Sequence, residues 1–167
     1  SKRATLLWVL DKTKTNMGAR CLRRWLEQPL RDSKAINSRL DSVEEFINNT
    51  RMRSNLSDAL SGIRDIERLT SKIAFGSPSP RDLLALGVSL KSLPSVKLIL
   101  ENSKSSLLKK IYENIFLLED IADKLTNAIT DNPPALLKDG GYIRNGFDKE
   151  LDELRNAETM GKEWLVN

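Results

Sequence analysis

Cys21 is a candidate nucleophile in this sequence, because two arginines, Arg20 and Arg23, stand close to it. Nearby guanidinium groups lower the pKa of a thiol and favour the nucleophilic thiolate. Cys21 also lies one residue before the apolar face of an expected helix, where a small packed side chain is the commoner role. It is the single cysteine in 167 residues, which excludes an internal disulfide and a multi-cysteine metal site. The sequence therefore favours a packing role for Cys21.

Acidic pairs are the next candidates, at Glu44-Glu45 and Glu119-Asp120. Paired carboxylates can transfer protons or bind a metal ion, but both pairs flank apolar positions at helical spacing, which is typical of a solvated helix face. The chain contains no histidine, so histidine-based acid–base catalysis and histidine metal ligands are both excluded. We predict no catalytic, cofactor-binding or metal-binding residues in this chain.

Gly161-Lys162 is the nearest match to a phosphate-binding loop. That loop needs Gly-x-x-x-x-Gly-Lys followed by Ser or Thr, so that backbone amides surround the phosphates. Here Glu163 follows the lysine, and Asn156 stands at the position of the first glycine. No ATP site, and no enzyme activity, is therefore expected of this chain itself.

Arg20, Arg23 and Arg24 form the strongest electrostatic feature, on the face of a predicted helix opposite its apolar residues. Three roles stay open for this face. It can be a solvated surface with Arg23 paired to Glu27 one turn on, a contact with another domain, or a contact with nucleic-acid phosphates. The net charge of +4, from 27 basic and 23 acidic residues, permits the last role but is too small to argue for it.

A leucine-rich composition with only 5% aromatic residues favours an all-α, multi-helical fold. Residues 5–10 are apolar and predict an extended or buried segment. No apolar run approaches the roughly 18 residues that cross a bilayer, so no membrane contact is expected.

Thr15 or Asn16 is the expected cap of the first helix and Ser33 of the second, and Pro80 is expected in the first turn of the fifth. Apolar residues three and four apart predict eight or nine helices, over residues 17–27, 33–49, 52–62, 66–74, 80–93, 96–100, 108–118, 121–131 and from 147 onward.

Asp139-Gly140-Gly141 marks a tight turn near the C-terminal end. Apolar pairs flank it, at residues 136–137 and 142–143, and two glycines permit positive φ, so a small β-hairpin near 136–143 is predicted.

After a second break at residues 145–146, apolar spacing predicts a long helix. It carries no stop signal, as expected for a piece of a longer protein. Residues 1–146 are predicted as a helical core and 147–167 as the start of this long helix, in one structural domain. The apolar positions of the long helix are Phe147, Leu151, Leu154, Ala157, Met160, Trp164 and Leu165.

Four blocks of the chain resemble, in order, the core domain of the MutS family of DNA mismatch-repair ATPases. The first covers residues 10–30 and contains Thr-Asn-Met-Gly-Ala-Arg-Cys-Leu-Arg-Arg-Trp-Leu. The last covers residues 133–155 and contains Asp-Gly-Gly-Tyr-Ile-Arg-Asn-Gly-Phe-Asp-Lys-Glu-Leu-Asp-Glu-Leu-Arg. Residues 39–46 and 66–83 supply the two weaker blocks. The resemblance covers nearly the whole chain, and its first and last blocks are the specific ones.

The resemblance implies a lever domain, domain III of that family, which couples an ATPase mechanically to a clamp that grips DNA. The parent protein is then expected to recognise mismatched double-stranded DNA, to bind and hydrolyse ATP with Mg, to homodimerise and to work with a MutL-type repair partner. A cytoplasmic, nucleoid-associated location in a bacterium is expected. The family's Phe-x-Glu mismatch-reading pair, nucleotide loop, clamp and returning lever helix are not found in this sequence, so those activities belong to the parent.

Two groups of residues are predicted to carry the coupling. Asp139, Gly140 and Gly141 would fix the angle at which the lever helix departs, toward a clamp absent from this chain. The second group is an interdomain junction near the N-terminus and comprises Asp11, Thr13, Thr15, Met17, Gly18, Arg20 and Arg24.

The alternative to a coupling domain is an autonomous helical module that binds nucleic acid or another protein.

Overall fold

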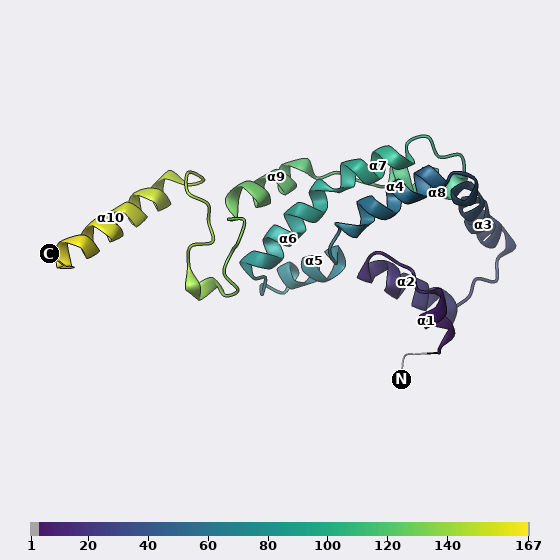
Figure 1. Cartoon of the computed structure of the whole chain (residues 1–167), viewed down its shortest axis with the longest axis horizontal. Helices are drawn as coiled ribbons and strands as arrows, with labels where there is room; N and C mark the ends of the chain where they lie inside the picture. The colour runs from purple at the N-terminus through teal and green to yellow at the C-terminus, as the bar shows by residue number, and fades with distance from the viewer. Residues whose placement is uncertain (1–3, 167) are drawn as a thin grey trace.

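Ten α-helices and one 3-10 turn make up most of residues 4–166, the part of the chain that this computed structural model describes (Figure 1). The all-α prediction is confirmed. The side chains at positions 162, 163, 165 and 166 lie outside the described set, and with them the expected apolar position at Leu165. The helices are α1 (Leu6–Leu10), α2 (Asn16–Glu27), α3 (Ser33–Asn48), α4 (Thr50–Ser61), α5 (Ile66–Ala74), α6 (Pro80–Lys91), α7 (Leu93–Leu100), α8 (Ser106–Glu113), α9 (Glu119–Ala128) and α10 (Lys149–Val166), and the 3-10 turn η1 is Leu137–Asp139.

Helix α1 is the one helix not expected from the sequence. The Thr5 hydroxyl accepts a hydrogen bond from the Trp8 backbone N–H at 3.2 Å, and this cap favours a single helical turn over an extended conformation. The segment is also exposed, with Leu6 at 64% and Trp8 at 56% of their possible surface. The prediction of an extended or buried segment over residues 5–10 is therefore wrong.

Local capping chemistry sets most helix starts. The Thr15 side chain caps α2, as predicted. Asp32, rather than Ser33, caps α3, because its two carboxylate oxygens accept from the backbone N–H groups of Lys34 and Ala35. Helix α6 starts with Pro80 in its first turn, as predicted, behind a capping box formed by Ser79 and Asp82.

Two neighbouring clusters of buried residues hold the helices together. The first consists of Ile63, Val96, Leu100 and Leu108 and joins α7 and α8 to the residues around α4. The second joins α5, α6 and α9 and consists of Leu69, Leu86, Leu90 and Ala122. Helices α6 and α9 make the most extensive helix–helix contact. Since Ile66 and Leu93 pack against both clusters, the body from α4 to α9 is continuous.

Helices α6 and α7 together form a run, Pro80–Leu100, that is long and apolar enough to cross a membrane by length and composition alone. The expectation that no apolar run approaches this length is wrong for this segment. The run supplies Leu86, Leu90, Val96 and Leu100 to the buried clusters, so its apolar character is explained by core packing.

The apolar face of α3 is exposed, although its spacing predicts a covered face. Five apolar residues stand at helical spacing on α3, and only one of them, Phe46, packs against a buried cluster. Small polar groups face α8 instead: the Ser42 hydroxyl lies 3.1 Å from that of Ser105, and the Glu45 carboxylate accepts the Lys104 and Ser105 backbone N–H groups at 2.7 Å each. The exposed positions are Ile36, Leu40, Val43 and Ile47.

The β element near the C-terminal end is a single antiparallel bridge between Ile129 and Ile143. Thr130 N–H donates to the Tyr142 carbonyl at 3.0 Å, and Arg144 N–H donates to the Ala128 carbonyl at 2.7 Å. The partner of Ile143 thus lies before Pro133-Pro134, not in residues 136–137, where η1 begins instead. Two prolines without N–H groups cannot donate to a ladder, which explains the longer loop. Beyond the bridge, α10 projects away from the other helices (Figure 1).

Asp82 is expected to make the free energy of unfolding depend on pH in the acid range. Both its oxygens lie 2.8 Å from Lys72 Nζ, and Ser79 donates through its hydroxyl at 2.7 Å. Partial burial raises the pKa of Asp82, but these hydrogen bonds outweigh it and hold the pKa at about 2. A pKa depressed in the folded state gives a stabilisation that is complete well above the unfolded value of 3.8 and falls as the pH drops toward 2.

We therefore expect Asp82 alone to account for a loss of about 1 kcal/mol in unfolding free energy between pH 6 and pH 3. Asp82→Asn should remove that part of the pH dependence while lowering stability at pH 6. Urea unfolding at both pH values measures it, with the exposed Asp58→Asn as the matched control. An equal acid loss in the native chain and in Asp82→Asn would contradict the assignment.

Candidate interdomain junction

The turn between α1 and α2 is built by three of the predicted junction residues. Asp11 accepts two hydrogen bonds from Thr13, from its hydroxyl at 2.6 Å and from its backbone N–H at 3.1 Å. These hydrogen bonds hold the pKa of Asp11 below its ordinary value. Thr15 accepts the Gly18 N–H at 3.0 Å and so caps α2. The polar residues of this block therefore have a local role, which is to fix how the chain enters α2.

Gly18 and Met17 anchor the start of α2 from two sides. A Cβ at Gly18 would lie 3.1 Å from the Thr15 hydroxyl oxygen and 3.3 Å from the Thr13 Cβ, so glycine lets the turn close against the helix. Met17 packs against the first buried cluster. Met17 thus faces the body of this chain, and Gly18 faces the turn that precedes α2.

Arg20 ties α2 to the start of α5. Its guanidinium donates to both oxygens of Asp65, at 2.6 and 2.9 Å, and to the Glu67 carboxylate. Asp65 is also the N-cap of α5 and accepts the Arg68 N–H. The side-chain hydrogen bond from Arg20 lowers the pKa of Asp65 to about 2, and the same bonds raise the pKa of Arg20. Arg20 therefore links α2 to the start of α5 through Asp65, a residue 45 positions later in the sequence.

Arg24 remains on the exposed side of α2, in its last turn, where a cation interacts favourably with the helix dipole. Trp25, the next residue, stands at an apolar helical position in the sequence, but it is 44% exposed. The Arg39 guanidinium of α3 lies 3.7 Å from the centre of the Trp25 ring. Sequence spacing carried no sign of this contact, because the two residues lie on separate helices.

Arg20 offers a direct test of how α2 is held. Arg20→Ala removes the bonds to Asp65 and Glu67, so we expect faster hydrogen exchange of the α2 backbone amides with little change in α6 and α9. Arg23→Ala is the matched control, because Arg23 is exposed on the same helix and its side chain lies outside this ion-pair cluster. Equal exchange rates in the two variants would show that the cluster does not hold α2.

The predicted turn at Asp139, Gly140 and Gly141 lies at the other end of the molecule. Gly140 has φ 66° and ψ −170°, and Gly141 also has φ 66°, which confirms the positive φ expected there. Asp139 is the last residue of η1. The turn leads into the bridge at Ile143 and, beyond it, into α10 (Figure 1).

Two arginines brace the segment between this turn and α10, and sequence reasoning missed both. Arg144 donates to both Asp131 oxygens, at 2.8 and 3.2 Å, and to the Ile129 carbonyl at 3.0 Å. The side-chain hydrogen bond lowers the pKa of Asp131. Arg155, in the second turn of α10, donates to the Ile143 carbonyl at 3.0 Å and to Asn145 at 2.8 Å. The start of α10 is thereby bonded back to the bridge.

Cys21 and Glu45, two of the reactive candidates in the sequence, each have a defined setting in the structure. Cys21 is half-buried and its thiol is free. Glu45 is occupied in accepting the first backbone N–H groups at the start of α8. No group of three or more metal-ligating side chains lies together in the described part of the chain.

The described fold is an all-α domain in which Arg20 ties α2 to α5 and two arginines hold the start of α10. A family profile described as MutS domain III matches residues 1–164, nearly the full length. The chain belongs to the MutS domain III family, as the resemblance of its first and last blocks predicts.

Relatives named DNA mismatch repair protein MutS are similar over nearly the whole chain. The protein of Desulforamulus reducens is 50% identical over 165 residues, which are 99% of this chain and 19% of that protein. The protein of Clostridium perfringens is 48% identical over 165 residues, 99% of this chain and 18% of that protein. The protein of Caldanaerobacter subterraneus subsp. tengcongensis is 45% identical over 167 residues. The chain thus spans about a fifth of the length of these relatives.

Proposed function

We propose that this chain is the helical core of a longer DNA mismatch-repair protein and that it couples an ATPase to a DNA-gripping clamp mechanically. The observation that carries the proposal is the fixed geometry where α2 and α10 join one packed body. Arg20 bonds α2 to α5, and Arg144 and Arg155 bond the start of α10 to the bridge through which it leaves the body. A body fixed in this way moves as a unit, which is what rigid-body transmission requires.

Helix α10 is the proposed lever. Its 18 residues correspond to about 27 Å at 1.5 Å per residue. Leu154, Met160 and Trp164 are exposed along it, as expected of a helix that awaits a partner from outside this chain. A small rotation at its root, next to Gly140 and Gly141, becomes a large displacement at its far end.

ATP with Mg, mismatched double-stranded DNA, a second copy of the parent and a MutL-type partner are proposed for the parent protein and not for residues of this chain. The support is the relatives' name, DNA mismatch repair protein MutS, and their fivefold greater length. A bacterial cytoplasmic, nucleoid-associated location follows from the same proposal.

The rival function is autonomous nucleic-acid binding by the basic face of α2. Arg23, Arg24 and Arg31 are exposed and favour it. Arg20, which would be the first member of the face, is instead bonded to Asp65 and Glu67. Partial neutralisation by two carboxylates weakens attraction for phosphates, so we rank this function second.

Fluorescence anisotropy with the 167-residue chain separates the two functions. We expect heteroduplex and homoduplex DNA to bind no more tightly than the non-specific range, about 10⁻⁴–10⁻⁶ M, and without preference for the mismatch. We also expect no ATP turnover. Tight and steeply salt-dependent binding by the isolated chain would favour the rival, and detectable ATP hydrolysis would overturn the proposal that the ATPase lies elsewhere.

A further inference from the structure

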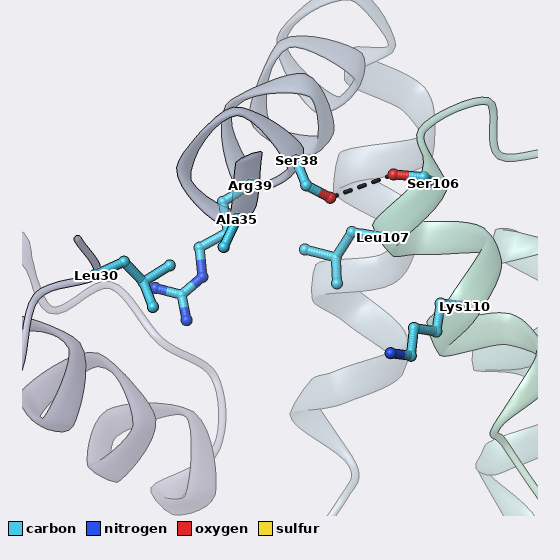
Figure 2. A pocket seen from close by; sticks show the side chains of 7 residues that line it. All are labelled: Leu30, Ala35, Ser38, Arg39, Ser106, Leu107 and Lys110. Atoms are coloured by element: carbon cyan, nitrogen blue, oxygen red, sulfur yellow. Dashed lines mark hydrogen bonds between the residues drawn. The ribbon is translucent and has the colours of Figure 1, made fainter. Parts of the chain in front are cut away.

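We infer that the pocket between α3 and α8 is a docking site for an acidic, amphipathic helical segment that comes from outside this chain. The pocket has a volume of about 360 Å³ and lies between α3 and α8, with Leu30 of the α2–α3 connection on the α3 side (Figure 2). The inference goes beyond the coupling function, because it assigns a binding surface and the chemistry of its partner.

The pocket has apolar walls on both sides. Leu30 and Ala35 lie on the side of the α2–α3 connection and α3, and Leu107 points toward them from α8 (Figure 2). Ser38 and Ser106 connect the two helices at one margin, with their hydroxyl oxygens 3.2 Å apart. A space of this size between two helices accommodates one or two apolar side chains of a third, which is the usual way an amphipathic helix is bound.

The charged groups at the pocket are all cationic. Arg39 extends from α3 and Lys110 from α8, on opposite sides of the space, and no acidic residue lines it (Figure 2). Among the side chains that the structure describes, neither Arg39 nor Lys110 is ion-paired with a carboxylate. The ring of Trp25 covers one face of the Arg39 guanidinium, and the N–H edges of a stacked guanidinium remain able to bind a carboxylate.

Charge complementarity therefore identifies the partner as acidic, and the apolar walls identify it as amphipathic. Nucleic-acid phosphates would satisfy the cations but would leave Leu30 and Leu107 unpaired with any apolar group. The second surface pocket, of about 370 Å³ beside α6, lacks this combination. Its two arginines share the site with Asp131, and Arg81 already donates to the Pro133 carbonyl at 2.9 Å.

The apolar walls at Leu30, Ala35 and Leu107 set the pattern expected of the partner. The partner segment should therefore carry apolar residues at positions i, i+4 and i+7, with glutamates beside them.

The test uses the full 167-residue chain and a fluorescein-labelled peptide of about four helical turns, with leucines at i, i+4 and i+7 and glutamates beside them. One control peptide has lysine for every glutamate, another has serine for every leucine, and a short duplex DNA is the nucleic-acid control. We expect saturable binding of the acidic peptide only.

Two variants on α8 locate the site. Lys110→Glu should weaken binding by about tenfold, because it reverses a charge that faces the bound carboxylates. Lys109→Glu makes the same charge change one residue away, outside the pocket lining, and should leave the affinity nearly unchanged. Circular dichroism checks that both variants fold, and Lys110→Ala gives an intermediate loss without charge reversal.

Four outcomes would overturn the inference. They are failure of the acidic peptide to bind, equal losses in Lys110→Glu and Lys109→Glu, equal binding of the lysine peptide, and duplex DNA that binds as tightly as the acidic peptide and competes with it. The last outcome would reassign the pocket to phosphate binding.

Discussion

Gly87→Val should lower the free energy of unfolding by about 2–3 kcal/mol, the largest effect expected of any single change discussed here. Gly87 lies buried in α6 where that helix crosses α9. A Cβ at this position would lie 2.9 Å from the Leu125 Cβ and 3.0 Å from the Thr126 Cγ2. These atoms sit close to the α9 backbone and cannot move aside cheaply, so the helices must separate and the second buried cluster must loosen.

Gly161→Val is the matched control for this change. Gly161 is also a helical glycine, in α10, but a Cβ there meets nothing within 4 Å. We expect it to change the free energy of unfolding, measured in urea, by no more than about 0.5 kcal/mol, as for most exposed substitutions. Similar losses in the two variants would mean that the close approach of α6 and α9 does not determine stability.

Gly141→Val should strain the turn before α10 by about 1–3 kcal/mol. The space around Gly141 is open, so steric crowding with other residues is not the cause. The cost comes from φ 66°, a conformation that a β-branched residue rarely adopts. Gly140 next to it, with φ 66° and ψ −170°, occupies a region that is essentially restricted to glycine, so the backbone has little room to share the strain.

Hydrogen exchange at the bridge measures this strain locally. The Arg144 amide is bonded to the Ala128 carbonyl and the Thr130 amide to the Tyr142 carbonyl, so both should exchange faster in Gly141→Val. Gly161→Val again serves as the control, since it adds the same side chain in open space without a positive φ. Unchanged exchange at both amides would contradict the strained-turn account.

The sequence predicted those features that depend on neighbours in the chain. Thr15 caps α2, and Pro80 stands in the first turn of α6, because caps and first turns are decided within four residues. The positive φ at Gly141 followed from two adjacent glycines between apolar pairs. Each of the eight or nine helices predicted from apolar spacing has a counterpart, but several ends differ. Asp32 rather than Ser33 caps α3, and α8 ends at Glu113 rather than at residue 118. Helix α9 ends at Ala128 rather than at residue 131, and α10 begins at Lys149 rather than Phe147.

Long-range pairing could not be predicted from the same reasoning. Arg20 is 45 residues from Asp65, and local spacing says nothing about which helices meet. Arg20 was therefore assigned to a surface or an external junction, when it closes an internal contact. The predicted junction as a whole, from Asp11 to Arg24, stays a prediction, as does the division of the chain after residue 146.

Helix α3 shows a further limit of periodicity. Ile36, Leu40, Val43 and Ile47 lie at helical spacing, and spacing identifies an apolar face without saying whether this chain covers it. The covered side of α3 uses Ser42 and Glu45, residues that look like a solvated face in the sequence. The same limit applied to Trp25, which stacks with Arg39 at the surface rather than packing in the core.

The central claim, that this domain transmits between an ATPase and a DNA clamp, is tested most directly in the full-length protein that contains this chain. The measurement is the ratio of ATP turnover with heteroduplex DNA to turnover with homoduplex DNA, in the native protein and in Arg20→Ala and Gly141→Val. The account predicts that both variants keep heteroduplex affinity and basal turnover, while the ratio falls at least about fivefold toward one. An unchanged ratio in both variants would contradict it, provided that hydrogen exchange shows α2 loosened in Arg20→Ala and the turn before α10 loosened in Gly141→Val.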